Sequence, residues 1–220
     1  GDFYDFIGLP DGRLAIVTGD VTGKGVPAAL VMATTRSLLR GEAPRLLSPS
    51  AILQRANELL IDDVPEHMFV TCLCAVLDPR TGKMTIANAG HNLPFVRNDR
   101  ATRELRATGM PLGLMPGMTY QEYETTLRAG DGLLLHSDGV VEAHNPQGDM
   151  FGFPRMRSLV AECDHSTTII DRLLDELDSF TGANWEQEDD ITLVLLSRTV
   201  EPPRPVDPGP AAPLTAEETV

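Results

Sequence analysis

The sequence predicts an α+β domain in which helices cover antiparallel sheets. Short β-rich segments, separated by Gly, Pro and Asp, make up most of the chain, and two pairs of amphipathic helical segments interrupt them. The order is strands, two helices, many strands, two helices and a last strand, which lacks the strict strand–helix alternation of a parallel sheet. A chain of 220 residues has room for one domain with a sizeable core.

The chain opens with a hairpin and a helix. Residues 2–19 predict two strands joined at the turn PDG, since Asp-Gly is a strong hairpin signal. Apolar residues then recur with helical spacing from Val26 to Leu39. Gly41 and Pro44 are expected to end this helix.

A second helix and a second hairpin follow. The helix is expected from about Ser50 to Ile61, with Ser48 or Ser50 as its N-cap. The apolar segments MFVTCLCAVLD and KMTIANAG flank the turn PRTG, which indicates a buried antiparallel hairpin.

The second half alternates short strands with two more helices. Four strands are expected in order: Leu93–Arg97, Thr102–Arg106, Tyr120–Leu127 and Gly132–Ser137. Helices are expected over 154–163 and 166–181, and DITLVLLSR predicts a last strand. The proline-rich run after about Val200 predicts a disordered tail or linker over residues 200–220, so the folded domain is expected to span residues 1–199.

Charge and cysteine content argue against several classes of protein. A net charge of -14 with only 18 Lys and Arg argues against a nucleic-acid surface. The three cysteines, Cys72, Cys74 and Cys163, form no disulfide framework and suit a reducing compartment. Because no apolar run approaches the roughly 18 residues needed to span a bilayer, we expect a cytoplasmic protein without membrane insertion.

Carboxylates recur at the ends of the expected strands. Asp20 follows LAIVTG, Asp138 follows GLLLHS, Asp189 and Asp190 precede ITLVLL, and Asp2 opens the first strand. A single Asp beside Gly is more often a turn residue that bonds its own backbone. A cluster of unpaired carboxylates, however, would raise each member's pKa unless cations neutralised it. With no His or Cys at ligand spacing, such an oxygen donor set favours magnesium or manganese over zinc.

The segment GDVTGKG, from Gly19 to Gly25, resembles a phosphate-binding loop but does not match one. A P-loop has the pattern G-x-x-x-x-G-K-[ST], and here one spacer and the magnesium-binding hydroxyl are missing. Lys24 and the N-terminus of the following helix remain candidates for contacting a substrate phosphate. The alternative is an exposed lysine with no such role.

Eight motifs occur in an order that identifies a family. They are GDFYDF, GDVTGKGVPAAL, MFVTCLCAVLD, NAGHNLP, TGMPLGL, LRAGDGLLLHSDGVVEA, MFG and DDITLVLL. Over residues 1 to about 198 the chain resembles the metal-dependent serine/threonine phosphatases related to protein phosphatase 2C. More narrowly, it resembles the bacterial branch typified by the sporulation stage II phosphatase E. The resemblance implies a β-sandwich of two antiparallel sheets flanked by helices, in four layers (αββα), with a dimetal centre at one end.

The resemblance also implies a role for individual residues. Asp20 would bridge two Mn²⁺ or Mg²⁺ ions, and Asp20 and Asp138 would be the catalytic residues. His91, in NAGHNLP, is like Lys24 a candidate for contacting the substrate, and the alternative is a histidine that fixes a turn by hydrogen bonds. The implied metal ligands are Asp20, the Val21 carbonyl, Asp138, Asp189 and, as further candidates, Asp2 and Asp190.

The implied activity is hydrolysis of a phosphoserine or phosphothreonine on a protein by a metal-activated water. The branch implies that the substrate is a phosphorylated anti-sigma-factor antagonist, and that a sensory domain precedes this domain in a longer chain. The alternative is a catalytically weak, phosphatase-like module that binds a phosphoprotein or a regulatory partner.

Overall fold

The elements of the structure follow the order that the sequence predicts. The computed structural model describes residues 1–65, 67–98, 101–163, 168–182 and 186–199. The tail expected over 200–220 lies outside these ranges, as do the first two residues of the helix expected over 166–181. In chain order the elements are β1 (Phe3–Gly8), β2 (Leu14–Val21), α1 (Val26–Leu46), α2 (Pro49–Leu60), β3 (Val70–Leu77), β4 (Lys83–Ala89), β5 (Phe95–Asn98), β6 (Ala101–Glu104), β7 (Tyr123–Thr126), β8 (Gly132–His136), the 3₁₀ helix η1 (Asp138–Val140), α3 (Gly152–Glu162), α4 (Ile169–Thr181) and β9 (Leu193–Ser197).

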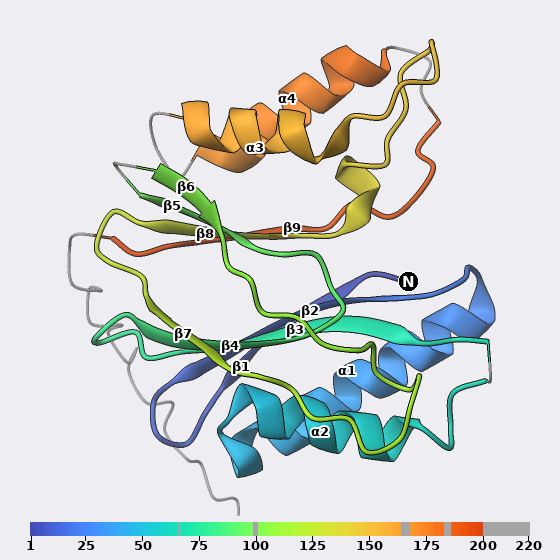
Figure 1. Ribbon diagram of the computed structural model, residues 1–220, viewed down its shortest axis with the longest axis vertical. Helices are drawn as coiled ribbons and strands as arrows, with labels where there is room; N and C mark the ends of the chain where they lie inside the picture. The colour runs from blue at the N-terminus through green and yellow to red at the C-terminus, as the bar shows by residue number, and fades with distance from the viewer. Residues whose placement is uncertain (66, 99–100, 164–167, 183–185, 200–220) are drawn as a thin grey trace, which may run out of the picture.

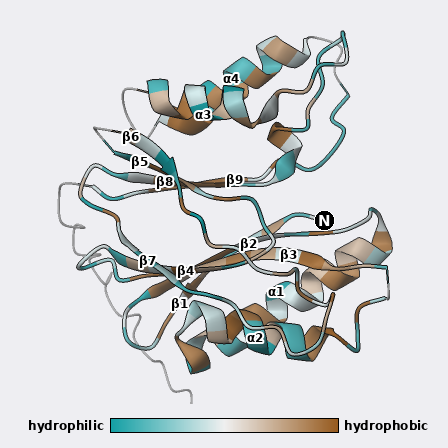
Figure 2. Cartoon of the chain, viewed as in Figure 1, coloured by the Kyte–Doolittle hydropathy of each residue, from teal (hydrophilic) through white to brown (hydrophobic). Residues whose placement is uncertain are grey.

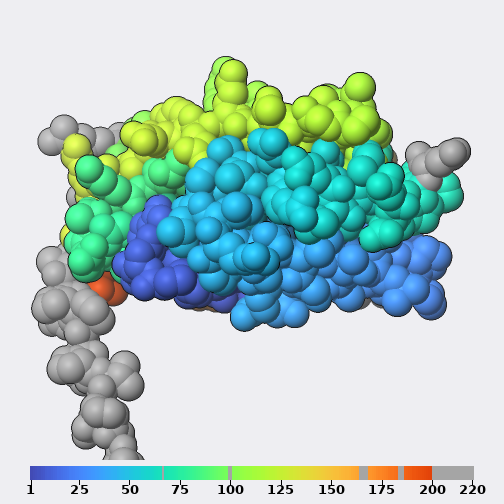
Figure 3. Space-filling view, turned by 90° about the horizontal axis from the view of Figure 1, so that it is seen from below, coloured from blue at the N-terminus to red at the C-terminus, as the bar shows by residue number. Residues whose placement is uncertain are grey.

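Two antiparallel sheets form the centre of the molecule (Figure 1). Among the described residues, one sheet has the strand order β1-β2-β3-β4-β7 and the other has the order β6-β5-β8-β9. Helices α1 and α2 cover the outer face of the first sheet, and α3 and α4 cover that of the second (Figure 1). Seen from below, α1 and α2 lie side by side, with the segment that leads into β7 along the flank of α2 (Figure 3). The predicted α+β sandwich with four layers is confirmed.

Buried apolar residues form three clusters, one between the two sheets and one between each sheet and its helices. Figure 2 shows hydrophobic residues along the central strands. Strand β2 contributes side chains to two of these clusters, because successive side chains of a strand point to opposite faces of its sheet. Ala15 and Val17 pack towards α1 and α2, whereas Ile16 packs between the sheets. Full burial of a side chain such as Ile16 contributes about 1.5–3 kcal/mol relative to exposure.

Helix α1 is longer than predicted. The expected stop at Gly41 and Pro44 was wrong, because the helix continues through both residues to Leu46. Its buried face also continues, with Leu39 and Ala43 four residues apart and fully buried. Pro44 falls in the last turn, where the loss of one backbone hydrogen bond is outweighed by this packing.

Strands near the sheet margins are shorter than predicted. The segment 120–127 was expected to be extended throughout, but β7 has only four residues. Within the part of the chain that the structure describes, it is an edge strand whose one partner is β4. Short edge strands limit the unpaired backbone available to another chain.

Candidate metal centre

Asp20 occupies the next-to-last position of β2, at one end of the sandwich. It faces Thr71 of β3 across the sheet, and Val21 faces Val70. The strand was expected to end at residue 19, just before Asp20, and that was wrong, because β2 stays paired with β3 through Val21. The pairing therefore fixes the position of the Asp20 backbone at this end of the sandwich.

Two other segments bring carboxylates to the same end. Phe3 of β1 faces Gly19 of β2, which places the preceding residue, Asp2, beside Asp20. Asp138 begins the 3₁₀ helix η1 directly after β8. In the structure the N-terminus lies between the two sheets at this end of the molecule (Figure 1).

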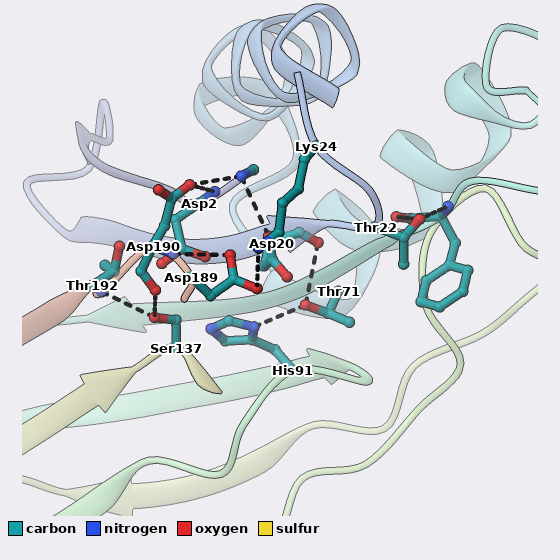
Figure 4. Close-up of polar contacts among 12 residues, drawn as sticks. Asp2, Asp20, Thr22, Lys24, Thr71, His91, Ser137, Asp189, Asp190 and Thr192 are labelled. Atoms are coloured by element: carbon teal, nitrogen blue, oxygen red, sulfur yellow. Dashed lines mark hydrogen bonds and ion pairs between the residues drawn. The ribbon is translucent and has the colours of Figure 1, made fainter. Parts of the chain in front are cut away.

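Ser137 ties the turn that carries Asp138 to the segment that carries Asp189 and Asp190. The Ser137 amide donates to the Thr192 carbonyl (3.0 Å), and the Thr192 amide donates to Ser137 Oγ (2.9 Å). Ser137 Oγ in turn donates to the Asp190 carbonyl (3.3 Å). These bonds hold the two acidic segments against each other (Figure 4).

Close packing explains why the SDG motif has a glycine at position 139. A Cβ atom on Gly139 would lie 2.1 Å from the carbonyl oxygen of Asp190, far inside any contact that a real Cβ makes. The two acidic segments can therefore approach this closely only because position 139 has no side chain.

Asp20 carries the signature of a carboxylate crowded by others. Burial, and then the charges of Asp2, Asp138 and Asp189, raise the pKa of Asp20 to about 7. Like charges at close range disfavour the ionised form. The four carboxylates therefore form one electrostatic group.

The outer carboxylates differ in their surroundings. Burial raises the pKa of Asp2, although the nearby hydroxyls of Ser137 and Thr192 oppose the shift. The hydrogen bond and the positive charge of the Gly1 amino group lower the pKa of Asp190. That amino group lies 2.8 Å from Asp190 Oδ2 and 3.9 Å from Asp20 Oδ1.

The donor set fits a hard divalent cation. An ideal Cβ on Gly1 would lie 2.5 Å from the Val21 carbonyl oxygen and 2.9 Å from Asp20 Oδ1, so these two oxygens face the same small space. Asp2 Oδ2 is buried and has no hydrogen-bond partner among the described residues. Within the same residues, no three His, Cys, Asp or Glu side chains are placed so that they could hold a metal ion together. Oxygen donors that leave positions for water suit Mg²⁺ or Mn²⁺.

Lys24 lies at the rim of the cluster. Its Nζ contacts the Glu188 carbonyl (2.5 Å) and lies 3.6 Å from Asp189 Oδ2. Gly25 and the residues from Gln187 to Asp190 line a pocket of about 260 Å³ together with Gly1 and Lys24. The lysine therefore adds positive charge beside the carboxylates, at a position open to solvent.

His91 lies below Asp20, on the inner side of the sheet (Figure 4). Its ring is buried, and Nδ1 lies 3.0 Å from the hydroxyl of Thr71. Burial, and to a lesser extent the neighbouring His136, lower the pKa of His91 to about 3, so the ring is neutral. His136 is buried as well and stacks on Phe95, as expected for a packed residue.

Sequence reasoning missed the polar residues that support the carboxylates. Thr71, Ser137 and Thr192 all make hydrogen bonds at this end of the sandwich. Each is a single small polar residue beside an apolar run, and each lies inside one of the family motifs, which are the signals that could have drawn attention to it.

The chain is similar to known proteins over most of its length. A family model described as Stage II sporulation protein E (SpoIIE) matches residues 10–199. Protein IcfG of Synechocystis sp. is 32% identical over 227 residues, which cover 90% of this chain and 36% of IcfG. The phosphoserine phosphatase RsbU of Bacillus subtilis is 29% identical over 204 residues, which cover 91% of this chain and 60% of RsbU. The chain thus spans between about a third and three fifths of these relatives.

A solved structure shares the fold. The crystal structure of the RsbU and RsbW domains of Rv1364c from Mycobacterium tuberculosis aligns with a TM-score of 0.76 and 29% sequence identity. The alignment covers 92% of this chain and 57% of that one.

Proposed function

Because the chain belongs to the SpoIIE family, we propose that it is a metal-dependent phosphatase that hydrolyses phosphoserine or phosphothreonine on a protein. The observation that carries the proposal is the carboxylate group around Asp20, where burial and then the charges of the neighbouring carboxylates raise the pKa of Asp20 to about 7. Such a group is stable in its ionised form only when cations neutralise it. Phosphoryl transfer also needs cations, because positive charge must lie beside the phosphoryl oxygens.

The ligands that we propose for two Mn²⁺ or Mg²⁺ ions come from four segments of the chain. Asp20 lies at the centre, with the Val21 carbonyl facing the same space. When bound, the ions supply an activated water and neutralise charge on the phosphoryl group. The proposed ligands are Asp20, Val21, Asp138 and Asp189, with Asp2 and Asp190 as further candidates.

The chain's own residues bind and orient in this proposal. Asp20 and Asp138 act as the catalytic residues because they hold charge at the centre of the cluster. Lys24, with 68% of its side chain exposed, attracts the phosphate dianion to the rim. The hydrogen bonds of Ser137 keep the Asp138 turn and the Asp189 segment at a fixed separation, which is the positioning that phosphoryl transfer requires.

We propose a phosphorylated protein of the anti-sigma-factor antagonist type as the substrate. The support is similarity to RsbU, whose name describes a phosphoserine phosphatase. We further propose a catalytic domain over residues 1–199, in the cytoplasm and joined to a sensory domain in a longer chain. Among the described residues, no helix has the length and apolar character needed to cross a bilayer.

The test is release of phosphate from a phosphoserine protein with and without Mn²⁺. We expect Mn²⁺-dependent release that Asp20→Ala abolishes. Asp11→Ala is the matched control, because Asp11 is exposed in the turn between β1 and β2, away from the strand ends that carry the cluster. Equal rates in Asp20→Ala and the unmodified protein would refute the proposal. Stoichiometric binding of the phosphoprotein without hydrolysis at saturating Mn²⁺ would instead favour the binding-module alternative.

A further inference from the structure

The NAGH turn holds the backbone of His91 at two points. The His91 amide donates to Asn88 Oδ1 (2.8 Å), and Asn88 Nδ2 donates to the His91 carbonyl (2.9 Å). Gly90 between them has a φ of 75°, in the left-handed region that favours glycine. The Asn88 side chain is itself buried. The turn is therefore built to present the His91 ring in one orientation.

The His91 ring is connected to the Asp20 backbone by hydrogen bonds through the hydroxyl of Thr71. His91 Nδ1 lies 3.0 Å from Thr71 Oγ1, and Thr71 Oγ1 lies 3.3 Å from the backbone carbonyl oxygen of Asp20. The carbonyl can only accept, so the single hydroxyl hydrogen of Thr71 is donated to Asp20. Nδ1–H of His91 then donates to Thr71 Oγ1, and the two bonds run in one direction (Figure 4).

This tautomer also suits the other ring nitrogen. His91 Nε2 is buried and has no partner within the described part of the chain. In the tautomer with the hydrogen on Nδ1, Nε2 is a bare acceptor. The opposite tautomer would bury an unpartnered N–H donor, which folded proteins tolerate least.

We propose that His91 and Thr71 are positioning residues for Asp20. Through the hydrogen bonds from His91 to Thr71 and from Thr71 to the Asp20 carbonyl, they hold the end of β2 on the inner side of the sheet. Asp20 is also the residue whose carboxylate is repelled by the neighbouring carboxylates. On the far side of Asp20 the chain is held as far as Thr22, which bonds Phe69, the residue before β3. It then passes through Gly23 and Gly25, both with positive φ. The inference rests on the proposed function, and His91 acts through Thr71, since its ring is only 8% exposed.

The test compares Mn²⁺ affinity, by calorimetry, with phosphatase kinetics in matched variants. Loss of a group that orients a metal ligand typically costs about 10–100-fold in affinity or activity. We expect Thr71→Val and His91→Ala each to weaken Mn²⁺ binding at least about tenfold and to lower kcat with little change in KM. The double variant should be no worse than either single one, because both break the same connection. Thr71→Ser should recover most of the loss.

Thr18→Val is the matched control. Thr18 lies two residues before Asp20 on β2, and its hydroxyl is buried without a partner among the described residues. Removing that hydroxyl should leave Mn²⁺ affinity within about twofold, since no contact is lost.

A second pair of variants keeps the proposal falsifiable if Thr71→Val does not fold. His91→Asn places an amide near the position of Nδ1, whereas His91→Gln places one near Nε2. We expect the Asn variant to bind Mn²⁺ more tightly than the Gln variant. Equal affinities, or additive losses in the double variant, would overturn the positioning role. If the unmodified protein binds Mn²⁺ but releases no phosphate, the proposed function fails while the affinity series still tests the positioning role.

Discussion

Gly139→Ala tests whether the close approach of two acidic segments matters for activity. The new Cβ would lie 2.1 Å from the Asp190 carbonyl oxygen, 3.0 Å from its carbonyl carbon and 3.2 Å from Ile191 Cγ1. Backbone, and not a flexible side-chain end, is the nearest obstacle. The segment that carries Asp190 must therefore move by about 0.9 Å before the shortest contact reaches even 3.0 Å.

The expected loss follows from that displacement. A misplacement of about 1 Å in a catalytic arrangement can lower the rate about 100-fold, or about 2.7 kcal/mol of transition-state stabilisation. Overpacking of this kind destabilises a fold by about 1–3 kcal/mol. We therefore expect a folded protein whose kcat/KM for a phosphoserine substrate falls about 100-fold.

The assay is steady-state phosphate release at saturating Mn²⁺, with the thermal unfolding midpoint measured in parallel. Gly8→Ala is the matched control, because a Cβ at Gly8 meets nothing within 4 Å and its backbone is not in the left-handed region. The control should keep its kcat/KM within about twofold, as expected for a surface substitution without contacts. A folded Gly139→Ala variant with kcat/KM within threefold of the unmodified protein would refute the steric argument.

Three further predictions concern other parts of the molecule. Asp5→Ala should lower the free energy of unfolding by about 2 kcal/mol, because it removes charge-assisted hydrogen bonds to Arg40. Burial opposes ionisation of Asp5, but the hydrogen bond from Arg40 holds its pKa below the usual 3.8, so this stability is present above that pH and is lost as pH falls through the lowered pKa. Urea and acid unfolding curves that coincide for Asp5→Ala and the unmodified protein would contradict this stabilising role of Asp5. The pKa of Asp20 is raised to about 7, mainly by burial. Because Mn²⁺ binds the ionised carboxylate, the affinity for Mn²⁺ should rise as pH increases through about 7. Because the folded protein favours protonated Asp20, the free energy of unfolding of the metal-free protein should fall as pH rises from about 4 to 7. In Asp20→Asn, both the affinity for Mn²⁺, measured by calorimetry, and the stability, measured by urea titration, should depend less on pH. An affinity for Mn²⁺ that does not change with pH in the unmodified protein would refute the role of Asp20 ionisation in metal binding. Finally, burial raises the pKa of Cys74 to about 12, so this thiol should react with a disulfide reagent only after unfolding, and rapid labelling of the native protein would contradict its placement.

Periodicity and turn signals were enough to predict antiparallel sheets covered by helices but not every boundary, and the four-layer sandwich was predicted from the family resemblance. Helix α1 shows why. Gly41 and Pro44 are local signals for a stop, yet the helix continues because Leu39 and Ala43 pack against the sheet. Tertiary packing overrode local propensity there, and no stretch of sequence displays that packing.

The candidate site shows a similar division. The aspartates could be predicted because each belongs to a motif at a strand end. Thr71 also lies in a motif, MFVTCLCAVLD, but nothing in that apolar strand distinguishes this threonine as a residue of the site. It becomes visible only through the register that sets it opposite Asp20, and through a turn twenty residues later in the sequence that delivers His91.

Anomalous diffraction at the manganese edge, from crystals of the protein soaked in Mn²⁺, tests the central claim most directly. The claim is that carboxylates from separate segments gather at Asp20 in order to hold catalytic cations. It predicts anomalous density in contact with the Asp20 carboxylate and shared with Asp138 or Asp189. Density that avoids Asp20, at a Mn²⁺ concentration that supports hydrolysis, would contradict it.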